Sequence, residues 1–436
     1  MDITELDERI QTIFHNLSSF NYDKVKELCD SEKDRSKTNQ CHPSWNTYIN
    51  LLLQLNIAEK QYSSLSFLLP TKGFLRKENS LKVIYEALFI DVSKCLESLS
   101  PPKSSLEEWL NPIVMRTVKF VSARSSLVEL YGKLVIHSNE EEPLMPFESY
   151  VLELRSILEK NDGNNNRKKK ASFVTLETGL ECELGALLNL LEALVYSSKW
   201  DLFNSLMKID VADDKLRIWS EAYKTNKEER KISFTSAFLL RPQQDPLLYQ
   251  WFWKLKGAVL SKFSLYFHDI LIKQTSPVEL KNQCSKLTID YTSRISNFQK
   301  KTDAISVNLI FEATGLDSYK GPGYHLSIKN SRVLTGLELY PSAFSTPGSP
   351  PLNHWPNIIM ILEDFSDNLA NFEEIVHFHD VQYTYFISRI EERMILVAIY
   401  GVKKNDKNII VSNFFTELSA QLKCKKIFTS LKPGYK

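Results

Sequence analysis

The sequence predicts a multidomain protein of α and α+β class, in which an N-terminal all-α helical bundle is followed by a smaller α+β domain with a mostly antiparallel sheet. Apolar residues recur at the 3.6-residue spacing of amphipathic helices from the start of the chain to about residue 302. Beyond that point, β-branched and aromatic residues gather in short runs typical of strands. Because 436 residues suffice for two or three domains, we expect an all-helical domain at residues 1–302 and an α+β domain at residues 303–436.

The central helix of the first domain is predicted at residues 245–275. Asp245 and Pro246 form a helix-start signature, since the Asp245 carboxylate can accept from free backbone N–H groups and proline fits the first helical position. The residues that follow are apolar around most of the helix surface, which is typical of a helix buried on several sides. Polar and charged residues interrupt the run and argue against a membrane span: Lys254, Lys256, Lys262, His268 and Asp269.

The same periodicity predicts the other helices of the first domain. A capping box formed by Ser104 and Glu107, or by the serine and glutamate that follow them, opens a long helix. Ser276 and Pro277 combine a cap with proline at the first helical position, so another helix starts there. The predicted helical segments lie at residues 3–17, 43–69, 81–92, 105–134, 152–158, 177–196, 200–209, 213–223 and 276–301.

Residues 161–171 form the clearest loop of this domain. Asparagines and a glycine are followed by four basic residues at 167–170, a composition typical of a disordered segment. A basic tetrad of this kind can also act as a nuclear-import or acidic-lipid patch. We prefer a solvated loop, because no aromatic residue or amphipathic helix accompanies the charge.

The second domain contains four predicted strands, at residues 304–311, 355–362, 381–388 and 393–400. The last two are separated by residues 389–392, a connection short enough for a hairpin. An amphipathic helix at residues 406–422 is expected to close the domain. Between the first two strands, residues 318–353 are rich in Gly, Pro and Ser and predict a long loop.

The composition argues against several classes of protein. A formal net charge of +1 gives no overall basic field for nucleic acid. The six cysteines are scattered without a CxxC pair, which favours reduced thiols in a cytosolic protein over disulfides or a zinc site. The chain shows neither a signal-peptide layout nor an uninterrupted apolar stretch of about eighteen residues. We therefore expect no direct membrane span and a membrane location only through a partner.

Two motifs suggest chemistry, and both have a simpler interpretation. His377 and His379 point to one face if they lie in a strand, as two metal ligands do, but further ligands have no obvious position. We prefer hydrogen-bonded histidines at a strand end. Gly321-Pro322-Gly323 resembles a phosphate loop, yet the proline removes an N–H donor and no Lys-Ser/Thr follows, so a tight turn is expected. No nucleophile motif, cofactor site or metal site is visible in the residues.

Several stretches together resemble one protein family, that of the second subunit of the KICSTOR complex. The matches begin with SFNYDK at residues 19–24 and LSKFSLYFHDILIKQT at residues 260–275. They continue with SVNLIFEATGLDSYKGPGYH at residues 306–325, HWPNIIMIL at 354–362, EEIVHFHD at 373–380, TYFISR at 384–389 and SLKPG at 430–434. Their order and spacing cover nearly the whole chain, although residues 26–240 carry weaker markers. None is a catalytic motif, so the resemblance identifies a family rather than an activity.

The resemblance implies a non-enzymatic scaffold without a cofactor. Its expected partners are kaptin, an integrin-alpha FG-GAP repeat protein and the large seizure-threshold protein, and through them the GATOR complex. The family's complex is found on lysosomes, recruits the GATOR subcomplex that stimulates GTP hydrolysis by Rag GTPases, and is needed for nutrient deprivation to switch off mTOR complex 1. The chain is then expected in the cytoplasm, recruited to the lysosomal surface through the complex.

A scaffold binds its partners through extended surfaces, and an aromatic content of 11% offers anchors for them. An aromatic residue nevertheless lies in the core more often than on a contact surface. The candidate contact residues are Trp355, Tyr385, Phe415, Lys432, Pro433 and Gly434. Lysines near the C-terminus are better explained by a helix end and a docked tail than by stacking of single-stranded nucleic acid. Two rival functions stay open: a module that binds small GTPases or trafficking complexes directly, and a hydrolase that uses His377 and His379.

Overall fold

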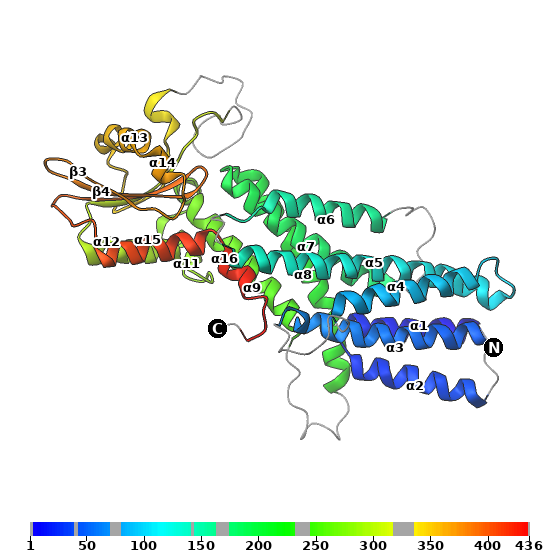
Figure 1. Cartoon of the computed structure of the whole chain (residues 1–436). Helices are drawn as coiled ribbons and strands as arrows, with labels where there is room; N and C mark the ends of the chain where they lie inside the picture. Colours follow the sequence, from blue (N-terminus) through cyan, green and yellow to red (C-terminus); the bar gives the residue numbers. More distant parts are fainter. Residues whose placement is uncertain are drawn as a thin grey trace.

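The helices of the first half of the chain and the sheet lie at opposite ends of the molecule (Figure 1). In Figure 1 the helices α1 to α8, at residues 3–231, lie alongside one another at one end. The helices α9 (Leu247–Tyr266) and α16 (Lys425–Thr429) lie between them and the sheet. The structure is a computed structural model, which describes residues 3–38, 42–69, 80–140, 144–162, 174–231, 245–316 and 335–434.

Serine residues cap two helices of the first half, and the sequence predicts one of these caps. Ser80 and Ser104 each accept a hydrogen bond from the backbone N–H three residues later, which confirms Ser104 as the N-cap of the long helix. The Glu107 carboxylate reaches back to the N–H of Lys103. The helices are α1 (Ile3–Ser18), α2 (Tyr22–Thr38), α3 (Pro43–Ser63), α4 (Leu81–Ser98), α5 (Ser105–Asn139), α6 (Phe147–Asp162), α7 (Val174–Ser198) and α8 (Leu202–Lys231), with a 3₁₀ turn η1 (Ser66–Leu68) after α3.

Three features of this half differ from the predicted helices. The polar helix α2 is absent from the prediction, since it has few apolar residues to reveal its period. Residues 202–209 and 213–223 belong to the single helix α8, because no glycine or proline separates them, and residues 200 and 201 precede the helix. Of the loop predicted at residues 161–171, the first two residues end α6 and the others lie outside the described residues.

The predicted central helix consists of two helices, α9 (Leu247–Tyr266) and α10 (His268–Gln274). They are separated at Phe267, whose ψ angle of 15° departs from the helical region. The predicted cap is wrong, because Pro246 rather than Asp245 occupies the N-cap position and no side chain caps the helix. The central position is confirmed, since α9 contacts α3, α7, α8, α12, α16 and β2.

Two short helices lead from α10 to the sheet, α11 (Pro277–Cys284) and α12 (Tyr291–Thr302). Ser276 accepts from the N–H of Glu279 and caps α11, as its sequence predicts. Asp290 caps α12 in the same way. These caps fix where the chain enters β1.

Five strands form one antiparallel sheet in the order β2-β1-β5-β4-β3. They are β1 (Ser306–Phe311), β2 (Ser342–Thr346), β3 (Val376–His379), β4 (Thr384–Glu391) and β5 (Met394–Tyr400). The predicted class, helices followed by an α+β part with an antiparallel sheet, is confirmed. The structure also confirms the predicted strands that correspond to β1, β4 and β5, and the hairpin between β4 and β5. β2 lies in the segment predicted as a loop, of which residues 318–334 lie outside the described part.

Residues 355–362, predicted as a strand, form the helix α13 (Trp355–Asp364). A continuous apolar run of this length fits a buried strand or a buried helix equally well. The proline at its second position suits a first helical turn. The buried side chains follow a helical period: Trp355, Ile358, Ile361 and Leu362.

Helices cover both faces of the sheet (Figure 1). One face continues the apolar core of the helical bundle and is covered by α12 and α15 (Ile409–Leu422), while α16 (Lys425–Thr429) packs against α5 and α9. The other face forms a separate core under α13 and the short α14 (Ser366–Leu369). Because one core runs from the bundle into the sheet, the domain boundary at residues 302 and 303 stays a prediction.

Candidate functional site

Three of the candidate contact residues lie in the core around the sheet. Trp355 is 1% exposed, and its indole Nε1 donates to the carbonyl of Tyr340 at 2.8 Å. Tyr385 of β4 and Phe415 of α15 are both 0% exposed. Aromatic side chains of this size stabilise a core most when they are fully removed from water. In this structure the three side chains are core residues and not exposed contacts. Core packing was the alternative that the sequence analysis left open for them.

The other three candidate contacts, residues 432–434, follow α16 and are half-buried or exposed. Leu431 before them is buried, and Phe428 packs against Trp251 of α9 with ring centroids 6.0 Å apart. The end of the chain is therefore docked on the central helix. A partner contact by residues 432–434 stays a prediction.

His377 and His379 lie on β3 and are half-buried. Nε2 of His377 lies 3.0 Å from the carbonyl of Lys404. Nδ1 of His379 lies 3.0 Å from the Tyr383 carbonyl and 3.0 Å from the Thr384 hydroxyl. Both are thus hydrogen-bonded histidines of an edge strand. Among the residues that the structure describes, no group of three or more His, Cys, Asp or Glu is placed to hold a metal ion.

The cysteine thiols at three positions are buried and unreactive at neutral pH. Burial raises the pKa of Cys29 to about 12 and that of Cys182 to about 11. Burial likewise raises the pKa of Cys424 to about 11. Because the thiolate is the nucleophilic form of cysteine, these groups act as small apolar core residues.

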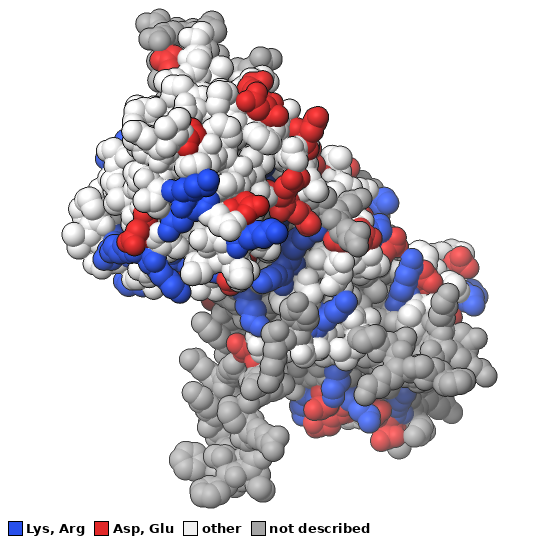
Figure 2. All heavy atoms as spheres, turned by 60° about the vertical axis from the view of Figure 1, so that its left-hand side comes forward, with Lys and Arg blue, Asp and Glu red and all other residues white. Residues whose placement is uncertain are grey.

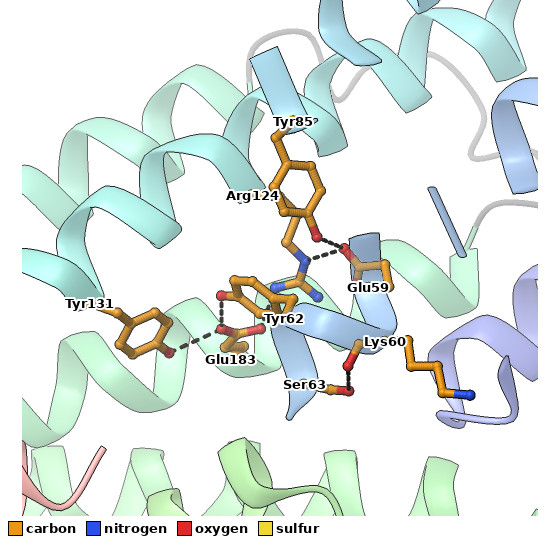
Figure 3. A network of polar contacts seen from close by, with 8 residues as sticks. All are labelled: Glu59, Lys60, Tyr62, Ser63, Tyr85, Arg124, Tyr131 and Glu183. Carbon is orange, nitrogen blue, oxygen red and sulfur yellow. Dashed lines mark hydrogen bonds and ion pairs between the residues drawn. The ribbon is translucent and has the colours of Figure 1, made fainter. Parts of the chain in front are cut away.

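A buried ion network lies inside the helical bundle (Figure 3). Arg124 of α5 donates through Nε to Oε1 of Glu59 on α3 at 3.0 Å, and through a terminal nitrogen to Glu183 on α7. All three side chains are almost fully buried. A single guanidinium therefore ties together helices from three separate stretches of the chain.

Tyrosine hydroxyls complete this network. Tyr85 donates to Oε1 of Glu59 at 2.7 Å. Tyr62 and Tyr131 both donate to Oε1 of Glu183, the latter at 3.0 Å. The Tyr62 ring also lies 4.3 Å from the guanidinium carbon, a distance that allows a cation–π contact. The polar groups thus satisfy one another within the bundle.

Burial dominates the electrostatics of the network. It raises the pKa of Glu59, and the neighbouring Arg124 offsets this only in part. Burial works against the charge of Arg124 as well, but Glu183 and Glu59 outweigh it and raise its pKa well above the usual value. The guanidinium therefore stays charged. We interpret the network as a structural one that fixes how α3, α5 and α7 pack.

One faint signal for this network is present in the sequence. Arg124 and Glu183 are charged residues on otherwise apolar helix faces, which is unusual unless they are paired. Their pairing could not be predicted, because the two residues lie 59 positions apart in the chain. Sequence reasoning therefore missed this buried polar network.

One side of α8 is apolar and exposed, and we call it the α8 face. It consists of Phe203, Leu206, Met207, Val211 and Ile218, which are between 36% and 51% exposed. The opposite side of the helix is buried against α7 and α9. Exposed apolar patches on one face of a helix are typical of protein interaction sites. Exposed Asp210 and Asp214 lie among the apolar residues.

Within the described ranges, no helix has both the length and the apolar character needed to cross a membrane.

Comparison with known proteins settles the family. Residues 5–436 match the sequence model of a family described as "KICSTOR complex C12orf66 like". The chain belongs to this family. KICSTOR subunit 2 of Xenopus laevis is 33% identical over 436 residues, which span 98% of this chain and 96% of the relative. KICSTOR subunit 2 of Danio rerio is 32% identical over 437 residues, with 98% and 96% covered. The resemblance to the KICSTOR family is thereby confirmed over both the helical and the sheet-containing parts.

Proposed function

We propose that this chain is a non-enzymatic scaffold subunit of a KICSTOR-like complex. In this role it helps to place the GATOR complex, which activates GTP hydrolysis by Rag GTPases, on lysosomes. It thereby lowers mTOR complex 1 signalling when amino acids or glucose are scarce. The observation that carries the proposal is the similarity to KICSTOR subunit 2 over 98% of the chain. The hydrogen-bonded histidines and protonated thiols agree with a role without chemistry.

We assign the α8 face to a contact with another subunit of that complex. Its members recur at helical spacing along one side of α8, which suits an amphipathic helix of the partner lying alongside. Asp210 is exposed on the same side, and Asp214 there already pairs with Arg217, so the partner helix is expected to carry a Lys or Arg opposite Asp210. The candidate partners are kaptin, the integrin-alpha FG-GAP repeat protein and the large seizure-threshold subunit.

A second copy of this chain is a poor occupant of the α8 face. Two-fold pairing of the face with itself is centred between Phe203 and Ile218, at about Asp210. The Asp210 carboxylates of the two copies then approach each other near the symmetry axis. Like charges at the centre of an interface disfavour pairing.

Affinity purification of the tagged chain, from cells with and without amino acids, tests the proposed function. We expect the other KICSTOR subunits and GATOR to be recovered. Cells lacking the chain should keep mTOR complex 1 active during starvation, measured by phosphorylation of its substrates. Recovery of no KICSTOR or GATOR component overturns the proposal. Direct binding of a purified Rag or Rab protein to the isolated chain would support the GTPase-binding module instead.

A double variant tests the α8 face within this scheme. Met207→Asp with Val211→Asp is expected to reduce recovery of the contacting subunit by about tenfold or more, because two apolar contacts become charges. Leu152→Asp is the matched control, since Leu152 is 66% exposed on α6, outside the α8 face. Unchanged recovery with the double variant, alongside normal recovery of the wild-type complex, excludes the α8 face while leaving the proposed function intact.

A further inference from the structure

One end of the sheet exposes apolar side chains on turns and helix ends, and we call it the sheet-end surface. Single exposed apolar residues are common, but a cluster of them at one place on the surface is typical of an interaction site. Their exposed fractions are 40% for Ile305, 99% for Val381, 57% for Val402, 72% for Ile409 and 53% for Ile410. Because these residues lie together and contribute little to the core, we infer that they contact another molecule or a membrane.

Strand pairing brings three of the five residues to the same end of the sheet. Ser306 at the start of β1 pairs with Ile399 near the end of β5, so Ile305 lies beside the chain that leaves β5. The start of β4 pairs with the end of β5, and the Thr384 hydroxyl donates to the carbonyl of Val402 at 2.9 Å. The turn from β3 to β4, which carries Val381, therefore lies next to Val402.

Helix packing brings the other two residues to this end. α12 and α15 run antiparallel, because Phe298 stacks on Phe414 with ring centroids 3.7 Å apart while Arg294 pairs with Glu417 at 2.9 Å. The last turn of α12 therefore lies beside the first turn of α15, where Ile409 and Ile410 are exposed. Facing residues one turn beyond the stacked rings are Lys301 and Ile410.

Lysines surround the exposed apolar residues. They are Lys300, Lys301, Lys403, Lys404 and Lys407. Within the part of the chain that the structure describes, none of them forms an ion pair, and Lys404 lies over the Tyr400 ring at 5.2 Å. They outnumber the nearby carboxylates of Asp303, Asp380 and Asp406. Figure 2, in which this end comes forward, shows Lys and Arg gathered on the lower flank of the α+β part.

We propose that the sheet-end surface docks onto an anionic lipid bilayer. Exposed isoleucine and valine side chains on protruding turns can enter the headgroup boundary, while the surrounding lysines attract anionic lipids. Each lysine close to such a membrane strengthens binding by about fivefold. The apolar residues protrude from three separate loops and a helix start at one end of the sheet, which favours a lipid surface over an acidic protein that the lysines alone would attract. The proposal concerns the isolated chain and does not depend on the proposed function.

Vesicle flotation with the purified full-length chain tests this inference. We expect binding to vesicles of phosphatidylcholine mixed with phosphatidylserine, weaker binding at high salt, and little binding to phosphatidylcholine alone. Ile409→Asp with Ile410→Asp should lower binding by about tenfold or more. These substitutions keep α15 intact, since acidic residues are favourable in a first helical turn.

A matched control separates docking from a general effect of charge. Ile57→Asp with Ile136→Asp adds the same two charges at residues that are 57% and 58% exposed on the helical bundle. We expect this control to bind vesicles as the wild type does. Equal binding by the wild type and the Ile409 and Ile410 variant overturns the proposal, as does a wild type that binds no anionic vesicles. A wild type that ignores vesicles but loses an acidic protein partner in this variant assigns the surface to that protein.

Discussion

Lys262 of the central helix α9 donates a hydrogen bond to Glu391 at the end of β4, and the two side chains are 1% and 8% exposed. The partners lie 129 positions apart in the chain. The Tyr266 hydroxyl, one turn further along α9, donates to the other carboxylate oxygen at 2.7 Å. This buried pair fastens the helical bundle to the β4–β5 hairpin, so the relative placement of the two parts depends on it.

Removal of the Lys262 cation from this pair should lower the stability of the fold. We expect Lys262→Met to lower the free energy of unfolding by about 3–5 kcal/mol, because the Glu391 carboxylate is left buried without its counter-charge. Adding Glu391→Gln should recover much of the loss, since the amide oxygen still accepts from Tyr266 and no charge remains. Urea unfolding followed by tryptophan fluorescence measures each variant.

The matched control is Lys273→Met, which removes an exposed ion pair with Asp269 on α10. Exposed pairs of this kind contribute about 1 kcal/mol or less. Similar losses for Lys262→Met and Lys273→Met would contradict a dominant role for the buried pair.

The burial and pairing of Lys262 could not be predicted from the sequence. In the sequence it counts among the charges that argue against a membrane span at residues 245–275. The structure agrees that α9 is no membrane span, but it buries this lysine instead of exposing it. The partner comes from a distant hairpin, and one sequence contains no signal for such a pairing. Long periodic helices could be predicted because their pattern is local, whereas buried charge pairs are created by tertiary packing.

The strands show the same limit. Residues 304–311 were predictable as a strand, because β-branched residues dominate them and β1 is buried along its whole length. The structure of residues 355–362 could not be predicted in this way. A short apolar run forms a strand if it pairs with a neighbouring strand and a helix if it packs over a sheet, and tertiary packing decides between the two. The edge strands β2 and β3 have five and four residues, which are too few for a pattern of alternation to decide between strand and loop.

The network around Arg124 makes a second prediction about stability. We expect Arg124→Met to cost about 3–5 kcal/mol, because two carboxylates lose their shared cation inside the bundle. Glu59→Gln should cost less, since burial already raises the pKa of Glu59 and a glutamine still accepts from Tyr85. Arg124→Lys should not restore stability, because an ammonium cannot bridge both carboxylates as the planar guanidinium does.

Chemical unfolding of these variants provides the measurement. Arg217→Met is the control, since it removes an exposed pair with Asp214 and should cost about 1 kcal/mol or less. A loss for Arg124→Met no larger than that of the control would show that the network does not hold the helices together.

His354 predicts how stability depends on pH. It is 5% exposed, and its Nδ1 lies 2.9 Å from the Tyr385 hydroxyl. Burial lowers the pKa of His354, and nearby Asp380 opposes this only in part. The unfolded chain therefore binds the proton more readily than the folded chain. The contribution of His354 is fully present above its unfolded pKa of about 6.5 and is lost as the pH falls through the lower folded pKa.

We accordingly expect the free energy of unfolding to fall between about pH 7.5 and about pH 5.5, and to fall less in His354→Gln. The glutamine can still hydrogen-bond the Tyr385 hydroxyl but takes up no proton. Urea unfolding of both proteins across this range measures the difference. Parallel curves for the two proteins would show that His354 does not titrate on unfolding.

Two helical glycines should respond in opposite directions to the same substitution. Gly132 lies inside α5, and a Cβ there meets nothing within 4 Å. Gly132→Ala is expected to stabilise the protein by about 0.5–1 kcal/mol, because alanine loses less conformational entropy in a helix. At Gly257 in α9, a Cβ would lie 2.1 Å from Oγ1 of Thr288. We expect Gly257→Ala to lower stability by about 1–3 kcal/mol, since the close approach between α9 and the segment before α12 must open.

The pair of variants separates helix propensity from packing. Thr288→Ala removes the hydroxyl nearest to the new methyl group, so Gly257→Ala should cost less in that background than in the wild type. Urea unfolding of the wild type, Gly257→Ala, Thr288→Ala and the variant with both substitutions gives the four values of this cycle. Stabilisation by both glycine substitutions would mean that the segment carrying Thr288 moves aside freely, and the contact between α9 and that segment would then not be a fixed part of the fold.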